Sequence, residues 1–244
     1  MAADASADPQ PGAQYRQSPR AAARRVPPWH RLAYIQRQLP AALIAAIQAL
    51  DLRPGQRVLD YGCADRPYRA QIPAGVAYCG ADLPGNAEAD VAIQPDGRLP
   101  AALGGFDAVL STQVLEHVED PVRYLQECAR VLAPGGRLLL STHGLMVYHP
   151  DPVDLWRWTG AGLRCQIERA GFVVDSVQGV MGLAACGLQF FQDGLRLRLP
   201  RRLRAPFCYG MQKLVALADR LDTAASRERD ALVYVVQARL AGPR

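Results

Sequence analysis

The chain has 244 residues, of which 50% are hydrophobic and 21% charged, and its formal net charge at pH 7 is +5. This length and composition predict one large globular domain or two small ones around a substantial core, and they exclude a disordered chain. No apolar run reaches the ~18 residues of a membrane-spanning helix.

The start of the chain differs in composition from the rest. Residues 1–28 are rich in Ala, Pro, Gln and Arg, which predicts a flexible N-terminal arm ahead of a folded domain at 29–244. The arm lacks the apolar core of a secretory signal, so we expect a cytoplasmic protein. The six cysteines show no CxxC pair, which favours free thiols over a disulfide framework or a metal site.

Apolar periodicity predicts helices and strands that alternate along the domain. Helices are expected at 32–50, with a break or kink at Pro40, at 120–132, beginning with an Asp cap and Pro121, and at 160–171. Strands are expected at 57–60, 76–83, 89–93, 106–112, 137–142, 172–177 and 231–239. This alternation favours an α/β fold with a doubly wound, mostly parallel seven-stranded sheet and helices on both faces.

The turn after the first strand, in "VLDYGCADRPY", is a candidate ligand site. Asp60 ends the strand and is followed by the small residues Gly62, Cys63 and Ala64, which let a ligand approach the backbone closely. The turn fits the dinucleotide pattern G-x-G-x-x-G poorly, and Asp60 with Asp65 would repel a pyrophosphate. A cationic nucleoside without phosphate, such as S-adenosylmethionine, removes that objection.

A second acid, Asp82, ends the next predicted strand, 22 positions after Asp60. A carboxylate at this place can accept hydrogen bonds from both ribose hydroxyls of a nucleoside. The structural alternative is that Asp82 only caps a turn before Pro84.

From Arg57 to about Val177 the chain resembles class I S-adenosylmethionine-dependent methyltransferases of the "methyltransferase type 11" kind. The resemblance is carried by "VLDYGCAD", "YCGADL", "PDGRLP", "FDAVLSTQVLEHVEDP", "ECARVLAPGGRLLLST" and "ERAGF", in the family's order and spacing. It implies a Rossmann-like methyltransferase fold, methyl-transfer activity and S-adenosylmethionine as the cofactor. A weaker resemblance, in "CADRPY" and "YHPDPVDLWRWT", points to a bacterial branch associated with sugar or polysaccharide metabolism.

The same resemblance implies roles for individual residues. Asp60 and Gly62, in the loop with Cys63 and Ala64, match the loop that holds the methionine portion of the cofactor. The remaining matches are Asp82 for the ribose, Leu83, Asp96 and Gly97 for the adenine, and Gln113 and Val114 for the lining of the pocket. Ala64 and Arg66 stand where the family has its second and third glycines, so a positive φ at Ala64 would be strained, and Arg66 is a candidate partner of the cofactor carboxylate.

Catalytic candidates follow the fifth predicted strand, in "THGLMVYHPDPVDLWRW". His149 is our first candidate and His143 our second for a general base toward an acceptor hydroxyl, with Asp151 and Asp154 nearby. We expect no metal site here, since clear ligand spacing is lacking. A separate alternative is that Tyr148, Trp156 and Trp158 stack on a ring of the acceptor.

Two further interpretations concern the rest of the chain. Glu116 and His117, in "LEHVEDP", are expected to shape the pocket rather than to act in catalysis. Residues 181–228 are expected to form a helical, basic insertion before the last strand, either covering the acceptor or, through 196–206, resting on anionic lipid.

The predicted function is therefore methyl transfer to a small-molecule acceptor, with a saccharide or glycan-precursor hydroxyl as the leading choice. The alternatives are a nucleic-acid methyltransferase, favoured by the pI of about 9.0 and the arginine clusters, and a non-catalytic regulator that only binds the cofactor.

Overall fold

The computed structural model describes residues 26–94, 96–150 and 153–242, so the predicted arm at 1–28 lies outside the described residues except at 26–28. The strands are β1 (Arg57–Tyr61), β2 (Ala77–Asp82), β3 (Val91–Ala92), β4 (Phe106–Thr112), β5 (Leu132–His143), β6 (Phe172–Gly182) and β7 (Ala231–Leu240). The α-helices are α1 (Ile35–Ala49), α2 (Pro121–Val131), α3 (Gly160–Arg169), α4 (Leu183–Arg196), α5 (Arg201–Ala218) and α6 (Ala224–Arg229).

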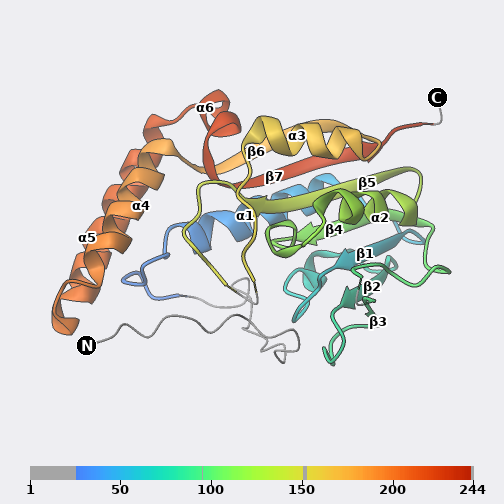
Figure 1. Ribbon diagram of the computed structural model, residues 1–244, viewed down its shortest axis with the longest axis horizontal. Coiled ribbons are helices and arrows are strands. Elements are labelled where there is room, and N and C mark those ends of the chain that lie inside the picture. The colour runs from blue at the N-terminus through green and yellow to red at the C-terminus, as the bar shows by residue number, and fades with distance from the viewer. Residues whose placement is uncertain (1–25, 95, 151–152, 243–244) are drawn as a thin grey trace, which may run out of the picture.

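All seven strands form one twisted sheet in the order β3-β2-β1-β4-β5-β7-β6 (Figure 1). The pairings β1–β2, β1–β4, β2–β3 and β4–β5 are parallel, whereas β7 runs antiparallel between β5 and β6. The predicted α/β fold with a mostly parallel seven-stranded sheet is thus confirmed. The strand order reverses between β1 and β4, and such a switch point leaves a crevice at the carboxyl ends of the two strands.

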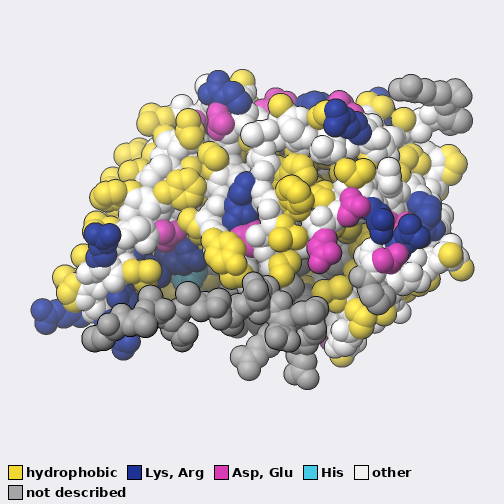
Figure 2. Space-filling view, viewed as in Figure 1, with side chains coloured by type: hydrophobic (Ala, Val, Ile, Leu, Met, Phe, Trp, Pro, Cys, Tyr) yellow, Lys and Arg dark blue, Asp and Glu magenta, His cyan; other side chains and the backbone are white. Residues whose placement is uncertain are grey.

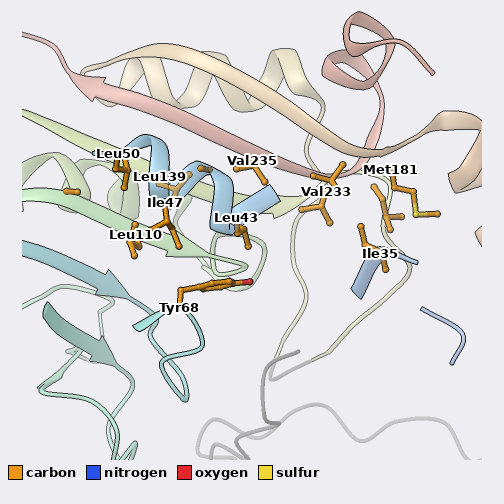
Figure 3. Close-up of a cluster of buried hydrophobic side chains, with 14 of the residues drawn as sticks. Ile35, Leu43, Ile47, Leu50, Tyr68, Leu110, Leu139, Met181, Val233 and Val235 are labelled. Atoms are coloured by element: carbon orange, nitrogen blue, oxygen red, sulfur yellow. The ribbon is translucent and has the colours of Figure 1, made fainter. Parts of the chain in front are cut away.

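Alternating side chains of the strands pack into two hydrophobic layers, one on each face of the sheet. Leu139 and Val235 join Leu43 and Ile47 of α1 on one face (Figure 3). Their neighbours along the strands point the opposite way and pack with Leu125 of α2 and with α3. Because strand side chains alternate with a period of two, the doubly covered sheet explains why consecutive residues in the middle of its central strands, at 58–59, 108–110 and 138–140, are all apolar.

Local signals set the start of α2 as expected. The Asp120 carboxylate accepts a hydrogen bond from the N–H of Arg123 at 3.0 Å, and Pro121 occupies the first turn of α2. Of the break or kink expected at Pro40, the break does not occur, because α1 continues through the proline. Buried side chains on both sides of the proline, Ile35 and Leu43, hold the helix against the sheet, and this packing outweighs the hydrogen bond lost at Pro40.

Residues 181–228 begin with the last two residues of β6 and continue into α4, α5 and most of α6. Figure 1 shows α4 and α5 side by side as a helical hairpin that projects from one end of the sheet. In the described part of the chain, none of the helices is both long enough and apolar enough to cross a membrane.

Candidate methyl-donor pocket and acceptor site

The loop after β1 has positive φ angles at three positions, although only one of them is a glycine. The φ angles are +84° at Gly62, +46° at Ala64 and +53° at Arg66. Left-handed backbone costs a non-glycine residue about 1–2 kcal/mol, so the strain foreseen at Ala64 is present, and Arg66 adds to it. A Cβ at Gly62 would lie 2.5 Å from Cγ2 of Val114, which shows how closely this loop packs on the segment after β4.

Asp60 lies at the carboxyl end of β1, and its side chain is buried. The hydroxyl of Tyr78, on β2, donates a hydrogen bond to Asp60 Oδ2 at 2.7 Å. Burial is the largest cause that raises the pKa of the Tyr78 hydroxyl, followed by the charge of Asp60, so this hydroxyl remains a donor. Tyr78 was not foreseen from the sequence. The signal that indicates its role is its position on β2, four residues before Asp82.

Asp82 joins the first loop to the second strand. Its Oδ2 accepts hydrogen bonds from the N–H of Ala64 at 2.6 Å and from Asn86 Nδ2 at 2.8 Å, and its Oδ1 accepts one from the N–H of Leu83 at 2.8 Å. Asp82 therefore does more than cap a turn, because it fixes the position of the strained residue Ala64. Asn86 also donates to the Ala64 carbonyl at 2.8 Å. This residue was not foreseen, because an amide four residues after Asp82 is only a weak sequence signal.

The guanidinium of Arg66 has partners on the protein itself. Its Nη2 pairs with Asp90 Oδ1 at 2.9 Å, and its Nε donates to the Glu88 carbonyl. The guanidinium thus binds the segment that follows β2. The contact of Arg66 with the cofactor carboxylate stays a prediction, and it would share the guanidinium with Asp90.

The other expected pocket residues lie on the segments that follow β2, β3 and β4. Leu83 keeps 39% of its surface exposed just past β2, and Asp96 is exposed. The Tyr61 hydroxyl donates to the Gly97 carbonyl, which ties that loop to β1. Beyond β4, Gln113 has a φ of +56°, and its N–H donates to the Ser141 carbonyl at 2.9 Å.

These residues fit S-adenosylmethionine. Two buried carboxylates, Asp60 and Asp82, favour a ligand with sulfonium and ammonium charges and disfavour a pyrophosphate. Burial raises the pKa of the Cys63 thiol to about 12, so the loop adds no thiolate. Leu83 offers an exposed apolar surface for a base beside the carboxylate that would take the ribose.

Three histidines converge beside this pocket. The ring centroids of His117 and His143 are 6.3 Å apart, those of His117 and His149 6.2 Å, and those of His143 and His149 5.9 Å. Glu116 lies among them, fully buried, with its Oε1 3.3 Å from His143 Nε2. Thr142 Oγ1 donates to the other oxygen of Glu116 at 2.9 Å. Glu116 and His117 thus belong to the same cluster as the two catalytic candidates.

The two catalytic candidates differ in exposure. His143 is 3% exposed, and no described residue bonds its Nδ1. Burial, then the charges of Arg157, His149 and His117, lower the pKa of His143 from 6.5 to about 3, so its ring is neutral and weakly basic. His149 is exposed on the loop that follows β5. An acceptor hydroxyl can therefore reach His149 more easily than His143.

Acidification from pH 7 to pH 5 is expected to destabilise the fold through His143. Since its pKa in the folded state is below that in the unfolded chain, the unfolded state takes up the proton, and stability falls as pH drops below 6.5 toward about 3. Between pH 7 and pH 5, this residue lowers the free energy of unfolding by about 2 kcal/mol. Urea unfolding of the protein and of His143→Gln should reveal this as a difference in the pH dependence of that free energy. A His143–Glu116 ion pair would reverse the sign, and NMR titration of the imidazole would reveal it directly.

Asp154, on the loop that carries His149, is not suited to act as a base. Asp154 forms a bidentate pair with Arg157, at 2.5 and 2.6 Å, and accepts the N–H of His149 at 2.6 Å. Burial would raise the pKa of Asp154, but Arg157 and the His149 N–H outweigh it and lower the pKa to about 2. Asp154 therefore holds the loop as a permanent anion. The other acid, Asp151, lies outside the described residues.

The aromatic side chains of the same loop are partly available to a ligand. Tyr148 is 75% exposed and Trp156 39% exposed, and the Trp156 and Trp158 ring centroids lie 5.9 Å apart. Trp156 Nε1 donates to the Val118 carbonyl at 2.7 Å, which fixes one edge of its ring. Within the described ranges, no three His, Cys, Asp or Glu side chains are arranged to hold a metal ion.

Comparison with known proteins agrees with this geometry. A family model described as "Methyltransferase domain" matches residues 34–176, which is more than half of the chain. The ubiquinone biosynthesis O-methyltransferase of Dinoroseobacter shibae is 34% identical over 131 residues, covering 46% of this chain and 51% of that protein. A mouse protein named "Probable tRNA methyltransferase 9B" is 36% identical over 99 residues, covering 37% of this chain and 22% of its own length. The chain thus spans about half, or less, of the curated relatives it matches.

Solved structures share the fold. The crystal structure of the cyclase SpnF has a TM-score of 0.55 at 20% identity, covering 85% of this chain and 83% of that one. A Burkholderia thailandensis 1,6-didemethyltoxoflavin-N1-methyltransferase, solved with S-adenosylhomocysteine, has a TM-score of 0.53 at 17% identity, covering 82% and 77%. At such identities only the fold is shown, and the cyclase illustrates that this fold also serves other chemistry.

The fold, with the buried carboxylates of Asp60 and Asp82 at the carboxyl ends of β1 and β2, is Rossmann-like. The chain belongs to the methyltransferase domain family, within the class I S-adenosylmethionine-dependent methyltransferases.

Proposed function

We propose that this enzyme transfers the methyl group of S-adenosylmethionine to a hydroxyl of a small, ring-bearing acceptor, with a saccharide or glycan precursor as the leading choice. The observation that carries the proposal is the exposed His149, held with His143 and His117 beside the pocket of Asp60 and Asp82. The exposed rings of Tyr148 and Trp156 support a ring-bearing acceptor, because aromatic surfaces stack on sugar rings.

In this proposal the loop after β1 holds the methionine portion of the cofactor, with Asp60 facing its positive charges. Asp82 accepts the ribose hydroxyls, and Leu83, Asp96 and Gly97 surround the adenine. Gln113 and Val114 close the pocket below the acceptor. When bound, S-adenosylmethionine supplies a methyl group on a reactive sulfonium, so positioning of the acceptor accounts for much of the acceleration.

With cofactor and acceptor bound, His149 would take the proton of the acceptor hydroxyl, and S-adenosylmethionine would supply the methyl group to the acceptor oxygen. His143 is not the base in this proposal, because a ring with a pKa of about 3 is a poor base at neutral pH. Together with the buried Glu116, it holds the cluster in position. The compartment we propose is the cytoplasm, which is supported by six free cysteines in the structure.

Two measurements test this proposal. Calorimetric titration with S-adenosylhomocysteine should give saturable binding, and its absence would refute the cofactor assignment. Radiolabelled S-adenosylmethionine should then label saccharide or glycan-precursor fractions of a lysate. Labelling confined to RNA or DNA would favour the nucleic-acid alternative, and cofactor binding without labelling of any fraction would favour a non-catalytic regulator.

A further inference from the structure

The helical hairpin of α4 and α5 buries polar side chains where a surface helix normally buries apolar ones. The amides of Gln189, Gln192 and Gln212 donate to the single carbonyl of Arg31, at 3.0, 2.8 and 2.9 Å. Gln212 Oε1 also accepts the N–H of Tyr34 at 2.7 Å. These buried amides are therefore satisfied, and they fasten the hairpin to the segment before α1.

The opposite side of α4 is apolar and open to solvent. Leu183, Phe190 and Phe191 are 40–60% exposed, and their spacing of seven and eight residues places them on one helical face. Gly187, Ala184 and Gly194 are exposed on α4 as well, so no charged side chain interrupts this face.

The second helix continues the same arrangement. Leu214 and Leu217 of α5, and Leu221 just beyond it, are 51–78% exposed, while the buried positions include Gln212. Hydrophobic side chains run along the hairpin in Figure 2. Contiguous exposed apolar side chains of this kind mark a surface that contacts another apolar phase or molecule.

The charges on the hairpin are mostly positive, and its acid, Asp193 of α4, pairs with Arg31 at 3.1 Å. Between Gly194 and Ala218 the sequence contains no Asp or Glu, so the charge of this segment, +6, exceeds the net charge of the whole chain, +5. Its six cations are Arg196, Arg198, Arg201, Arg202, Arg204 and Lys213. Five of them lie at or near the turn between the helices, and Figure 2 shows Lys and Arg side chains gathered at this tip.

We propose that the α4–α5 hairpin docks on a membrane surface that contains anionic lipid. The exposed Phe and Leu side chains enter the boundary between headgroups and acyl chains, and the arginines at the tip bind lipid phosphates. Nucleic acid offers phosphates, and its bases can stack on Phe191, but it has little aliphatic surface for Leu214 and Leu217. A second copy of the chain would bring the two basic tips together without any acid between residues 194 and 218 to neutralise them.

Vesicle flotation tests this docking without any cofactor, so its outcome is independent of the proposed methyl transfer. The protein is expected to float with vesicles of phosphatidylcholine plus phosphatidylglycerol, less so at high salt, and not with phosphatidylcholine alone. The triple variant Arg198→Gln/Arg201→Gln/Arg202→Gln should bind about 100-fold more weakly, at about fivefold for each arginine. The matched control replaces the exposed Arg53, Arg123 and Arg169 by Gln and should bind normally.

The apolar contribution is tested by Phe190→Ser/Phe191→Ser, which should also abolish flotation. Val122→Ser/Val173→Ser, at similarly exposed positions outside the hairpin, is its control. Because all these side chains are exposed, the variants should keep the melting temperature of the parent protein. The proposal is overturned if the protein fails to float with anionic vesicles or if the arginine variant binds as well as the parent. It is likewise overturned if light scattering shows a dimer that the Phe variant dissociates, or if the hairpin retains RNA in preference to vesicles.

Discussion

Replacing Asp82 by alanine is expected to weaken binding of S-adenosylhomocysteine by at least about 100-fold. Under the proposed assignment the carboxylate accepts two ribose hydroxyls, and hydrogen bonds to a charged group are worth about 1.5–3 kcal/mol each. The same substitution leaves the N–H of Ala64 without its partner, so the strained loop loses its support as well. Isothermal titration calorimetry measures the affinity directly.

Two further variants separate these contributions. Asp82→Asn keeps an oxygen that can accept the Ala64 N–H, so it should restore the loop while binding S-adenosylhomocysteine more weakly than the parent. Asp175→Ala removes an acid whose ion pair with Arg239 lies on the β6–β7 side of the sheet, and it should bind normally. Parent-like binding by Asp82→Ala would remove the ribose assignment while leaving the rest of the pocket in place.

Replacing His149 by alanine is expected to lower kcat by about 100-fold to 10,000-fold with a hydroxyl acceptor, the usual contribution of a general base. Binding of S-adenosylhomocysteine should stay within about twofold of the parent, because His149 belongs to the acceptor side of the site. Steady-state kinetics with the acceptor identified by radiolabelling measures the effect. Added imidazole should restore part of the activity, since His149 is exposed and its removal opens a path for solvent.

The chain provides a matched control for this substitution. His30 is the one histidine of the four that lies outside the cluster, so His30→Ala should leave kcat unchanged. Unchanged turnover in His149→Ala would show that the acceptor needs no base at this position, as expected for a neutral amine. A loss of cofactor affinity together with kcat would instead assign His149 to the shape of the pocket.

Local patterns accounted for much of the fold. Asp120 and Pro121 start α2 as expected, and the alternating apolar runs identified all seven strands. A break at Pro40 was one of two expectations and does not occur, because helix propensity is a local quantity while α1 is held by side chains packed on the sheet. The pairing of Arg66 with Asp90 was not foreseen for a similar reason, since Asp90 lies 24 positions away.

By itself, the sequence determined the α/β class, the family and the placement of Asp60 and Asp82 at the ends of adjacent strands, because strand period and motif order are local properties. Only the tertiary structure decided which distant groups meet. The order of β4 and β5 brings His117 beside His143 and His149, and the fold of the first loop joins Asp82 to Ala64. The face that α4 and α5 turn inward was also a tertiary outcome. Their glutamines bind the Arg31 carbonyl, 158 to 181 residues away, and leave the leucines outside.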